Sequence, residues 1–217
     1  MSERGLFITV EGGEGVGKST NMLWLEDFLR KNGVDVVVTR EPGGTPLSEE
    51  IRQLLLLVRD GQMGSMTELL LIFAARAEHI KEVIEPALAA GKWVLCDRFT
   101  DATYAYQSGG RGVSADTVRQ LETLVQGELR PDYTILLDVP VATGMGRARD
   151  RGELDRIEQE TMDFFERVRR SYLTQAENSS GRFRVVDASV PLEKVQKQLL
   201  KLGAELLSCW RVRQSEE

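Results

Sequence analysis

A glycine-rich segment, EGGEGVGKST at residues 11–20, ends in one lysine and two hydroxyl side chains. It matches the pattern of two glycines with four residues between them, followed by lysine and then serine or threonine. Glycines let backbone N–H groups turn toward an anion, a lysine adds positive charge, and a serine hydroxyl can ligate Mg²⁺. A tight turn with an incidental lysine is the alternative, but a strand-like run precedes the segment and a helical pattern follows it, which favours phosphate binding. The predicted phosphate-binding residues are Gly12, Gly13, Glu14, Gly15, Val16, Gly17, Lys18, Ser19 and Thr20.

Charged side chains follow two other apolar runs. Asp97 and Arg98 come directly after one run, and TREPGGTPL brings Glu41 and Pro42 after another, with Arg52 further along. In a phosphate-binding fold, an acid at a strand end contacts Mg²⁺ and an arginine binds phosphate with two donors. We therefore expect Asp97 and Arg98 near the bound phosphates, and a second substrate at the loop that contains Glu41. Taken alone, Asp97 and Arg98 are also compatible with a surface ion pair. The TREPGGTPL segment is likewise compatible with a simple turn.

Four arginines and one glycine occur close together in RARDRGELDRIEQE, residues 147–160. A solvated helix face with i,i+4 ion pairs is one interpretation. Beside a triphosphate site, a mobile lid that closes on the transferred phosphoryl group fits better, because that group needs positive charge around it. The four arginines are Arg147, Arg149, Arg151 and Arg156.

Short apolar runs alternate with segments of helical periodicity along the whole chain. The runs are residues 6–10, 34–39, 93–97, 133–139 and 183–188. This alternation predicts an α/β fold of the P-loop NTPase type, with a five-stranded parallel sheet, helices on both faces, and ligands at the carboxyl ends of the strands. The helices are expected to begin at or near Lys18, Leu47, Thr67, Ser114, Val141, Arg156 and Pro191.

The composition is that of one globular domain, residues 1–217, with a polar tail at about 211–217 that we expect to be frayed. The net charge of −6 argues against a nucleic-acid-binding surface. No apolar run approaches the ~20 residues needed to cross a bilayer, and the first motif starts too early for a signal peptide. Cys96 and Cys209 lack zinc-ligand spacing and are interpreted as reduced thiols. We therefore expect a cytoplasmic protein with no nucleic-acid or membrane partner.

Taken together, these motifs resemble those of the bacterial thymidylate kinase (dTMP kinase) family over nearly the whole chain. The resemblance is carried by EGGEGVGKST, TREPGGTPL, FAAR, DRFTDATYAYQ with GGRG after it, RPD and RGELDRIEQE. It implies a nucleoside-monophosphate-kinase fold, a homodimer, and transfer of the γ-phosphoryl group of ATP with Mg²⁺ to dTMP, which makes dTDP for dTTP synthesis. Because the variable P-loop positions hold no basic residue, the sequence is similar to the subclass whose catalytic arginine lies in the lid.

The resemblance also implies how the acceptor nucleotide is held. Arg98 and Arg52 are expected to bind the phosphate of dTMP, and Glu14 to lie near the sugar 3′-hydroxyl and the metal. The ring of Tyr106 is expected to leave little space for a 2′-hydroxyl. The residues expected to read the thymine edge are Arg76, Gln107 and Thr103.

Other residues are assigned to the donor side. Lys18, Arg98 and Arg151 are expected to surround the transferred phosphoryl group with positive charge. Ser19 and Asp97 are expected to bind Mg²⁺. The residues expected to reach the ATP phosphates and adenine are Arg147 and Arg149.

One position departs from the family pattern. The family often has a phenylalanine four residues before the base-reading arginine, where it stacks on thymine, but this chain has Ile72 there and an aromatic residue at Phe73. One step along a helix is a rotation of about 100°. Phe73 is therefore either a thymine contact or a core residue, and we keep it as a candidate substrate-binding residue.

Two other functions are compatible with a P-loop. A kinase for another monophosphate such as dCMP, or for a deoxynucleoside, would share the P-loop and the Asp-Arg pair. Only the base pocket distinguishes such kinases from a dTMP kinase. A GTP-dependent switch would need an NKxD motif, which this sequence lacks.

An amphipathic helix over residues 67–90 could face the core or a dimer partner, and periodicity does not distinguish these. The side chains interpreted as structural are His79, Trp24, Trp93 and Trp210.

Overall fold

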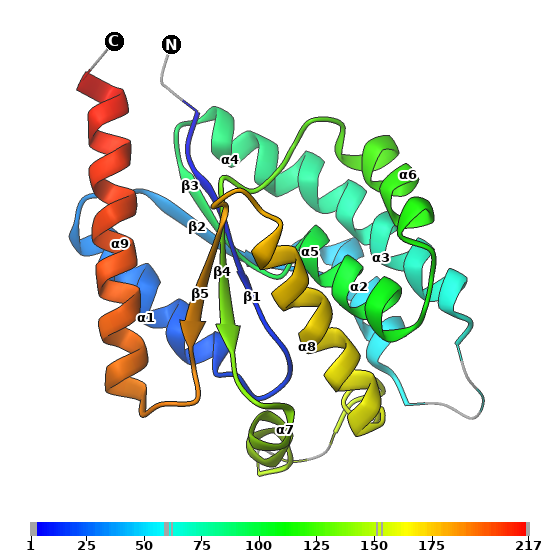
Figure 1. Ribbon diagram of the computed structural model, residues 1–217. Coiled ribbons are helices and arrows are strands. Elements are labelled where there is room, and N and C mark those ends of the chain that lie inside the picture. The colour runs from blue at the N-terminus through cyan, green and yellow to red at the C-terminus, as the bar shows by residue number, and fades with distance from the viewer. Residues whose placement is uncertain (1–3, 59–60, 62, 151, 153, 216–217) are drawn as a thin grey trace.

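The protein is described by a computed structural model that covers residues 4–58, 61, 63–150, 152 and 154–215. Its centre is a parallel sheet with the strand order β2-β3-β1-β4-β5 (Figure 1). Each strand coincides with an apolar run of the sequence, which confirms the predicted fold class. The strands are β1 (Phe7–Glu11), β2 (Val36–Arg40), β3 (Trp93–Asp97), β4 (Tyr133–Asp138) and β5 (Phe183–Asp187).

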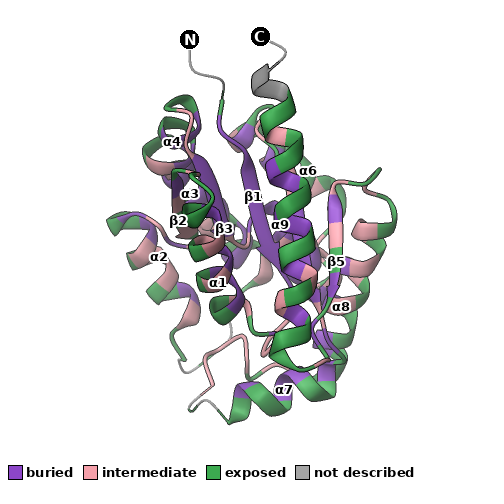
Figure 2. Cartoon of the chain, turned by 90° about the vertical axis from the view of Figure 1, so that its left-hand side faces the viewer, coloured by how far each residue is buried: buried purple, intermediate pink, exposed green. Residues whose placement is uncertain are grey.

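Helices cover both faces of the sheet. On one face, α1 (Lys18–Lys31) and α9 (Leu192–Ser215) bury a cluster that includes Leu25, Ile135 and Leu199. Most of the remaining helices cover the other face, and β1 between the two layers is buried along its length (Figure 2). They are α3 (Ser65–His79), η1 (Ile80–Ile84), α4 (Glu85–Ala89), α5 (Thr100–Thr103), η2 (Tyr104–Gly110), α6 (Ala115–Gln126) and α8 (Met162–Glu177).

Two further helices flank the edge where the strands end. Helix α2 (Pro46–Leu56) follows β2 and packs against α3, while α7 (Val141–Arg149) follows β4 and lies beyond the strand ends (Figure 1). The loop between β1 and α1 reaches the same edge. The polar and charged residues that follow β1, β2 and β3 are thus brought together at one edge, as expected for a parallel sheet.

Most predicted helices begin within two residues of the expected position. The helix expected near Arg156 is wrong: residues 156–159 form turns, and α8 begins at Met162. The Asp155 carboxylate accepts from the backbone N–H groups of Ile157 and Glu158, which stabilises the turn, and the Thr161 side chain caps α8. Helix α9 continues to Ser215 and so includes most of the polar tail that was expected at about 211–217.

The segment after β3 is helical through α5 and η2, which the sequence analysis did not predict. Part of it is π-helical, a conformation that often occurs at functional sites. It packs closely on α8, since a Cβ atom at Gly110 would lie 2.4 Å from the ring of Phe164. Tyr106 and Gln107 are therefore presented from a tightly packed element.

No helix within the described ranges has the length and apolarity to span a bilayer. The amphipathic helix predicted over 67–90 is present as α3, η1 and α4 in succession. Most of its apolar side chains face the core of this chain, while Leu70 is half exposed. The core residues are Leu69, Phe73, Ile80 and Ile84.

Candidate active site

The glycine-rich segment forms a loop that wraps the amino end of α1. Gly15 has φ 66° and Gly17 has φ 86°, a region that favours glycine. A Cβ atom at Gly15 would lie 1.9 Å from the carbonyl oxygen of Gly144 in α7, so the loop packs directly on that helix. Backbone N–H groups and a helix amino terminus together form an anion site. The geometry is that of a P-loop.

The lysine of the motif is folded back onto this loop. Lys18 Nζ donates to the carbonyl oxygens of Gly12 at 3.3 Å and Gly13 at 3.2 Å. Burial lowers the pKa of Lys18, and the charge of Arg98 adds to this effect. When a triphosphate binds, the Lys18 ammonium group can exchange these two carbonyl oxygens for phosphate oxygens.

The residues expected to hold Mg²⁺ lie beside the P-loop. Ser19 and Asp97 line the same hollow at the carboxyl end of β3. Asp97 Oδ1 is buried and has no hydrogen-bond partner among the described residues. An unpartnered carboxylate oxygen near a serine hydroxyl fits a Mg²⁺ ion, which prefers oxygen ligands. The described part of the chain holds no cluster of three or more His, Cys, Asp or Glu side chains suited to a metal, so phosphate and water oxygens would have to complete its coordination.

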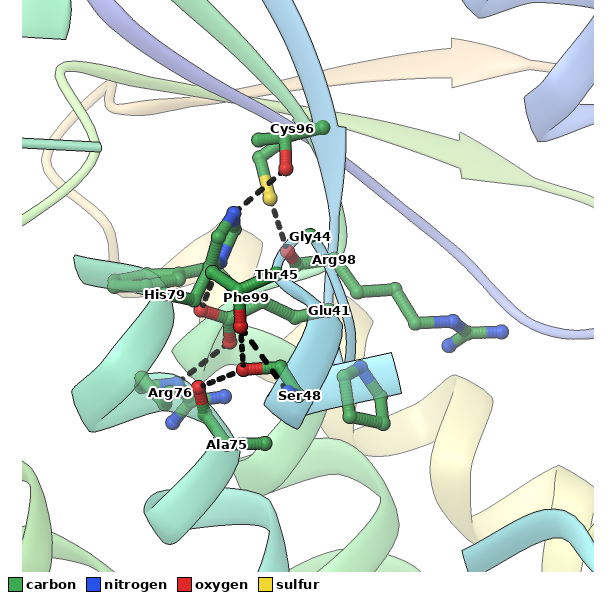
Figure 3. A network of polar contacts seen from close by, with 12 residues as sticks. Glu41, Gly44, Thr45, Ser48, Ala75, Arg76, His79, Cys96, Arg98 and Phe99 are labelled. Carbon is green, nitrogen blue, oxygen red and sulfur yellow. Dashed lines mark hydrogen bonds and ion pairs between the residues drawn. The ribbon is translucent and has the colours of Figure 1, made fainter. Parts of the chain in front are cut away.

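Arg98 connects the P-loop to the next cavity. Its backbone has φ 69°, and its carbonyl oxygen accepts from Cys96 Sγ at 3.0 Å, while its side chain extends away from that contact (Figure 3). The guanidinium donates to Glu14 Oε1 at 2.7 Å and lies over the Tyr106 ring, 4.7 Å from the centroid. Tyr106 also donates its hydroxyl to Glu14 Oε1 at 2.7 Å. The left-handed backbone at Arg98 turns this charge from the end of β3 toward Glu14.

A buried carboxyl group that the sequence analysis missed lies under this arginine. Glu11, the last residue of β1, accepts from the Phe99 backbone N–H and from the Tyr172 hydroxyl, both at 2.7 Å. Burial raises its pKa to about 8, and the charge of Asp101 acts in the same direction. Glu11 therefore links the end of β1 to the segment that follows β3 and to α8.

The cavity beyond Arg98 has a polar wall built around Arg76. Arg76 is 2 % exposed, and its guanidinium donates to Glu41 Oε2 at 2.7 Å and to Thr103 Oγ1 at 3.0 Å. The other Glu41 oxygen pairs with His79 Nδ1 at 3.0 Å (Figure 3). His79 is fully buried and also bonds to the Thr39 hydroxyl at 2.6 Å. The structural interpretation of His79 is confirmed, because it fixes the carboxylate that orients Arg76.

The predicted acceptor residues meet in one cavity. Arg52 reaches it from α2, where its Nη1 donates to the Pro42 carbonyl oxygen at 3.1 Å. Tyr106 and Gln107 reach it from η2. The predicted residues that line the cavity are Glu14, Glu41, Pro42, Arg52, Arg76, Arg98, Thr103, Tyr106 and Gln107.

Phe73 does not line this cavity, so its assignment as a substrate-binding residue is wrong. It is 2 % exposed and packs in the core with Leu69 and Val118. Ile72, one position earlier on α3, lines the cavity instead. The rotation of about 100° per residue explains the outcome, since only one of two neighbouring side chains can face the cavity. An aliphatic surface takes the place of the aromatic residue.

The sequence analysis also missed the carboxylate that closes the far end of the cavity. Glu68 is 1 % exposed and accepts from Gln107 Nε2 at 2.9 Å, from Arg111 and from Arg156. Burial by itself would raise the pKa of Glu68, yet the Gln107 hydrogen bond and the two arginines hold it below its usual value. Further cavity residues to which the sequence analysis assigned no role are Leu55, Leu56, Phe99, Ala102, Asp155 and Ile157.

The four arginines expected in the lid have different surroundings. Arg147 and Arg149 are exposed on α7, where Arg147 donates to the Ala188 carbonyl oxygen at 3.0 Å. Arg156 lies against the acceptor cavity and donates to the Leu55 carbonyl oxygen and to Glu68, each at 2.6 Å. Arg151, the expected catalytic arginine, falls outside the described residues.

A P-loop at the end of β1, an Asp-Arg pair at the end of β3 and an adjoining cavity lined by arginines define a P-loop phosphotransferase. Comparisons with known proteins identify the family. The thymidylate kinase family model matches residues 10–199. The chain is 58% identical over 207 residues to a thymidylate kinase of Ectopseudomonas mendocina, covering 95% of this chain and 99% of that one. It is 56% identical to a thymidylate kinase of Teredinibacter turnerae over 195 residues, which are 90% of this chain and 95% of that protein.

A solved structure agrees with the sequence comparisons. The crystal structure of thymidylate kinase from Ehrlichia chaffeensis superposes with a TM-score of 0.75 at 34% identity, covering 94% of this chain and 99% of that chain. The protein belongs to the thymidylate kinase family.

Proposed function

We propose that this chain transfers the γ-phosphoryl group of ATP to dTMP and produces dTDP. The observation that carries the proposal is a cavity that adjoins the P-loop and is lined by different chemical groups at its two ends. Arg98 and Arg52 give the end nearest the P-loop positive charge, while Arg76 and Gln107 give the other end directional hydrogen-bonding groups. Such a cavity suits a nucleoside monophosphate, with its phosphate toward the donor and its base at the polar wall.

The base wall favours thymine over the alternative acceptors. An arginine donates to a base carbonyl oxygen, and the amide of Gln107 pairs with a ring N–H group. Cytosine presents an acceptor at N3 and an amino group at C4, so both contacts would be lost inside a buried site. This supports dTMP over dCMP as the acceptor.

For the transfer itself, the acceptor phosphate is already ionised at neutral pH and needs no strong general base. The work of the protein is to align the two substrates and to surround the transferred group with positive charge. Lys18 and Arg98 are the proposed charges on the P-loop side, and Arg151 is the proposed charge from a lid formed by residues 147–160. Ser19 and Asp97 would hold Mg²⁺, which would neutralise the donor phosphates.

We also propose that the protein is a homodimer in the cytoplasm. Several large apolar side chains on and after α2 and on α3 are exposed, which is typical of a surface that a partner covers. Both cysteines are free thiols, as expected in a reducing compartment. The exposed apolar residues are Leu47, Leu54, Leu57, Val58, Met66 and Leu70.

A panel of acceptors tests the proposed function. Purified protein is assayed by coupled ADP detection with ATP, Mg²⁺ and either dTMP, dCMP, UMP, dGMP or thymidine. We expect dTMP to have the highest kcat/KM and dCMP to be lower on the scale of ~10⁴-fold that buried hydrogen-bond mismatches produce. Equal kcat/KM values for dTMP and dCMP would contradict the proposal, and activity on thymidine alone would assign the chain as a nucleoside kinase.

A further inference from the structure

Glu68 is placed where it controls one of the base-facing side chains. It lies in the first turn of α3, buried to 1 % exposure, and its Oε1 accepts from Gln107 Nε2 at 2.9 Å. Two arginines hold the same carboxylate: Arg156 Nη2 lies 2.6 Å from Oε2, and Arg111 Nε lies 3.2 Å from Oε1. Glu160 in turn pairs with Arg111. The side chain of Glu68 is therefore fixed from several directions.

The charge of this carboxylate determines how the Gln107 amide is oriented. An ionised carboxylate only accepts hydrogen bonds, whereas an amide has a donating NH₂ end and an accepting carbonyl end. Gln107 must therefore turn its NH₂ group toward Glu68. Its carbonyl oxygen is the end that remains for the cavity, which Gln107 lines. The orientation follows from the chemistry of the pair and does not depend on which amide atom was assigned as nitrogen.

We infer that Glu68 is a positioning residue that fixes the polarity of the Gln107 amide and thereby selects a base that carries an N3–H donor. The inference rests on the proposed function and deepens it. Thymine presents N3–H and pairs with the carbonyl oxygen of Gln107. Cytosine presents an unprotonated N3 and would need the NH₂ end, which Glu68 retains. The discrimination between thymine and cytosine is therefore set by Glu68, which acts through Gln107 and need not touch the base.

The substitution Glu68→Gln tests this inference, because the new amide can donate as well as accept. Gln107 is then able to turn its NH₂ group into the cavity. We expect the ratio of kcat/KM for dTMP to kcat/KM for dCMP to fall by about tenfold, the scale of one hydrogen bond. The ratio is measured on one preparation, so a loss of folded protein does not change it.

The matched control is Glu160→Gln. It removes a carboxylate from the same arginine, Arg111, but within the described part of the chain Glu160 forms no hydrogen bond with Gln107. We expect the dTMP to dCMP ratio to equal that of the parent. A fall as large as that of Glu68→Gln would show that the electrostatics of the arginine cluster, and not the amide polarity, set the preference, and would overturn the inference.

A second variant restores the polarity with the two groups exchanged. Glu68→Gln combined with Gln107→Glu places an acceptor-only carboxylate beside the base and a donating amide behind it, and it keeps one carboxylate near the two arginines. We expect its dTMP to dCMP ratio to return toward the parent value. A Glu68→Gln ratio unchanged from the parent, or an exchanged variant that stays as low as Glu68→Gln, overturns the inference. If the parent itself shows no preference for dTMP, the proposed function fails instead.

Discussion

Arg98 Nη2 lies 2.7 Å from Glu14 Oε1, so that the arginine at the end of β3 forms an ion pair with the P-loop. Both side chains are largely shielded from solvent, at 16% and 15% exposure. Partial burial strengthens such a pair relative to one on the surface. The contact joins the loop proposed for the donor to the cavity proposed for the acceptor, and Arg98 is in place to meet phosphate groups on either side.

Substitution of Arg98 should therefore damage both binding and chemistry. Arg98→Ala is expected to lower kcat/KM for dTMP by roughly 10²–10³-fold, the scale of one lost electrostatic contact in the transition state. Arg98→Lys should recover little of this loss, because lysine lacks the planar fork that pairs with Glu14 and stacks on Tyr106. Steady-state kinetics on both variants provide the measurement. Arg119→Ala, which removes an exposed ion pair on α6, serves as the control and should match the parent.

Tyr106 should control discrimination against ribonucleotides. Its ring lies between Arg98 and the packed core of α8, where it contacts Phe164 and Tyr172 edge-on. Tyr106→Ala opens space beside the sugar. The ratio of kcat/KM for dUMP to kcat/KM for UMP should therefore fall by a larger factor than the factor by which the dissociation constant for dTMP rises. Tyr106→Phe keeps the ring, loses only the hydrogen bond to Glu14, and should retain the ratio. An unchanged ratio in Tyr106→Ala would assign the discrimination to another residue.

Much of the site could be predicted because its residues follow strands or belong to local motifs. The P-loop, the Asp-Arg pair and the five strands have short-range patterns, and a parallel sheet gathers strand ends at one edge. Leu55, Asp155 and Ile157 reach the cavity only through tertiary packing, which leaves no periodic signal. The placement of Ile72 rather than Phe73 depended on helix rotation, and the family pattern could not decide it.

The buried carboxyl groups Glu11 and Glu68 were missed for a different reason. Glu11 directly precedes the first glycine of the P-loop pattern, and Glu68 stands early in a helix. Neither holds a position to which the P-loop pattern assigns a chemical role. Their partners are distant in the sequence, as with Tyr172 for Glu11 and Arg156 for Glu68. Only the assembled fold shows that these two acids support the residues that the motifs revealed.

The raised pKa of Glu11 predicts how stability depends on pH. The folded protein binds this proton up to about pH 8, whereas the ordinary pKa is 4.5. Because the folded state holds the proton more tightly, the stability from this group is complete below pH 4.5 and declines as the pH rises toward 8, by about 1.4 kcal/mol per pH unit. Glu11→Gln mimics the protonated acid and should remove this decline.

Denaturant unfolding at pH 5.5, 7.0 and 8.5 measures the effect. Glu11→Gln should gain stability relative to the parent as the pH rises through this window. Glu50→Gln, on the exposed side of α2, is the control and should keep the slope of the parent. Parallel stability curves for the parent and Glu11→Gln would show that Glu11 titrates at its ordinary pKa in the folded protein.

Arg151 is the residue on which the proposed lid chemistry depends. The transition state spreads negative charge over the oxygens of the transferred phosphoryl group, and the variable P-loop positions, from Gly13 to Val16, supply no basic side chain to meet it. Arg156 is held by Glu68 and the Leu55 carbonyl oxygen at the acceptor cavity, which leaves Arg147, Arg149 and Arg151 as the lid candidates. Arg151 directly precedes Gly152, which has φ 135° and allows the chain to bend.

Arg151→Ala should consequently lower kcat by roughly 10²–10⁴-fold, on the scale of an arginine that stabilises phosphoryl transfer. The dissociation constant for dTMP should change little, because the contact forms only in the reacting complex. Steady-state kinetics and equilibrium dTMP binding on the same variant separate these effects. Arg119→Ala, on the exposed face of α6, is the control and should match the parent in both measurements. A kcat within a few-fold of the parent would move the role to Arg149, and a large loss of dTMP affinity would make Arg151 a ground-state binding residue.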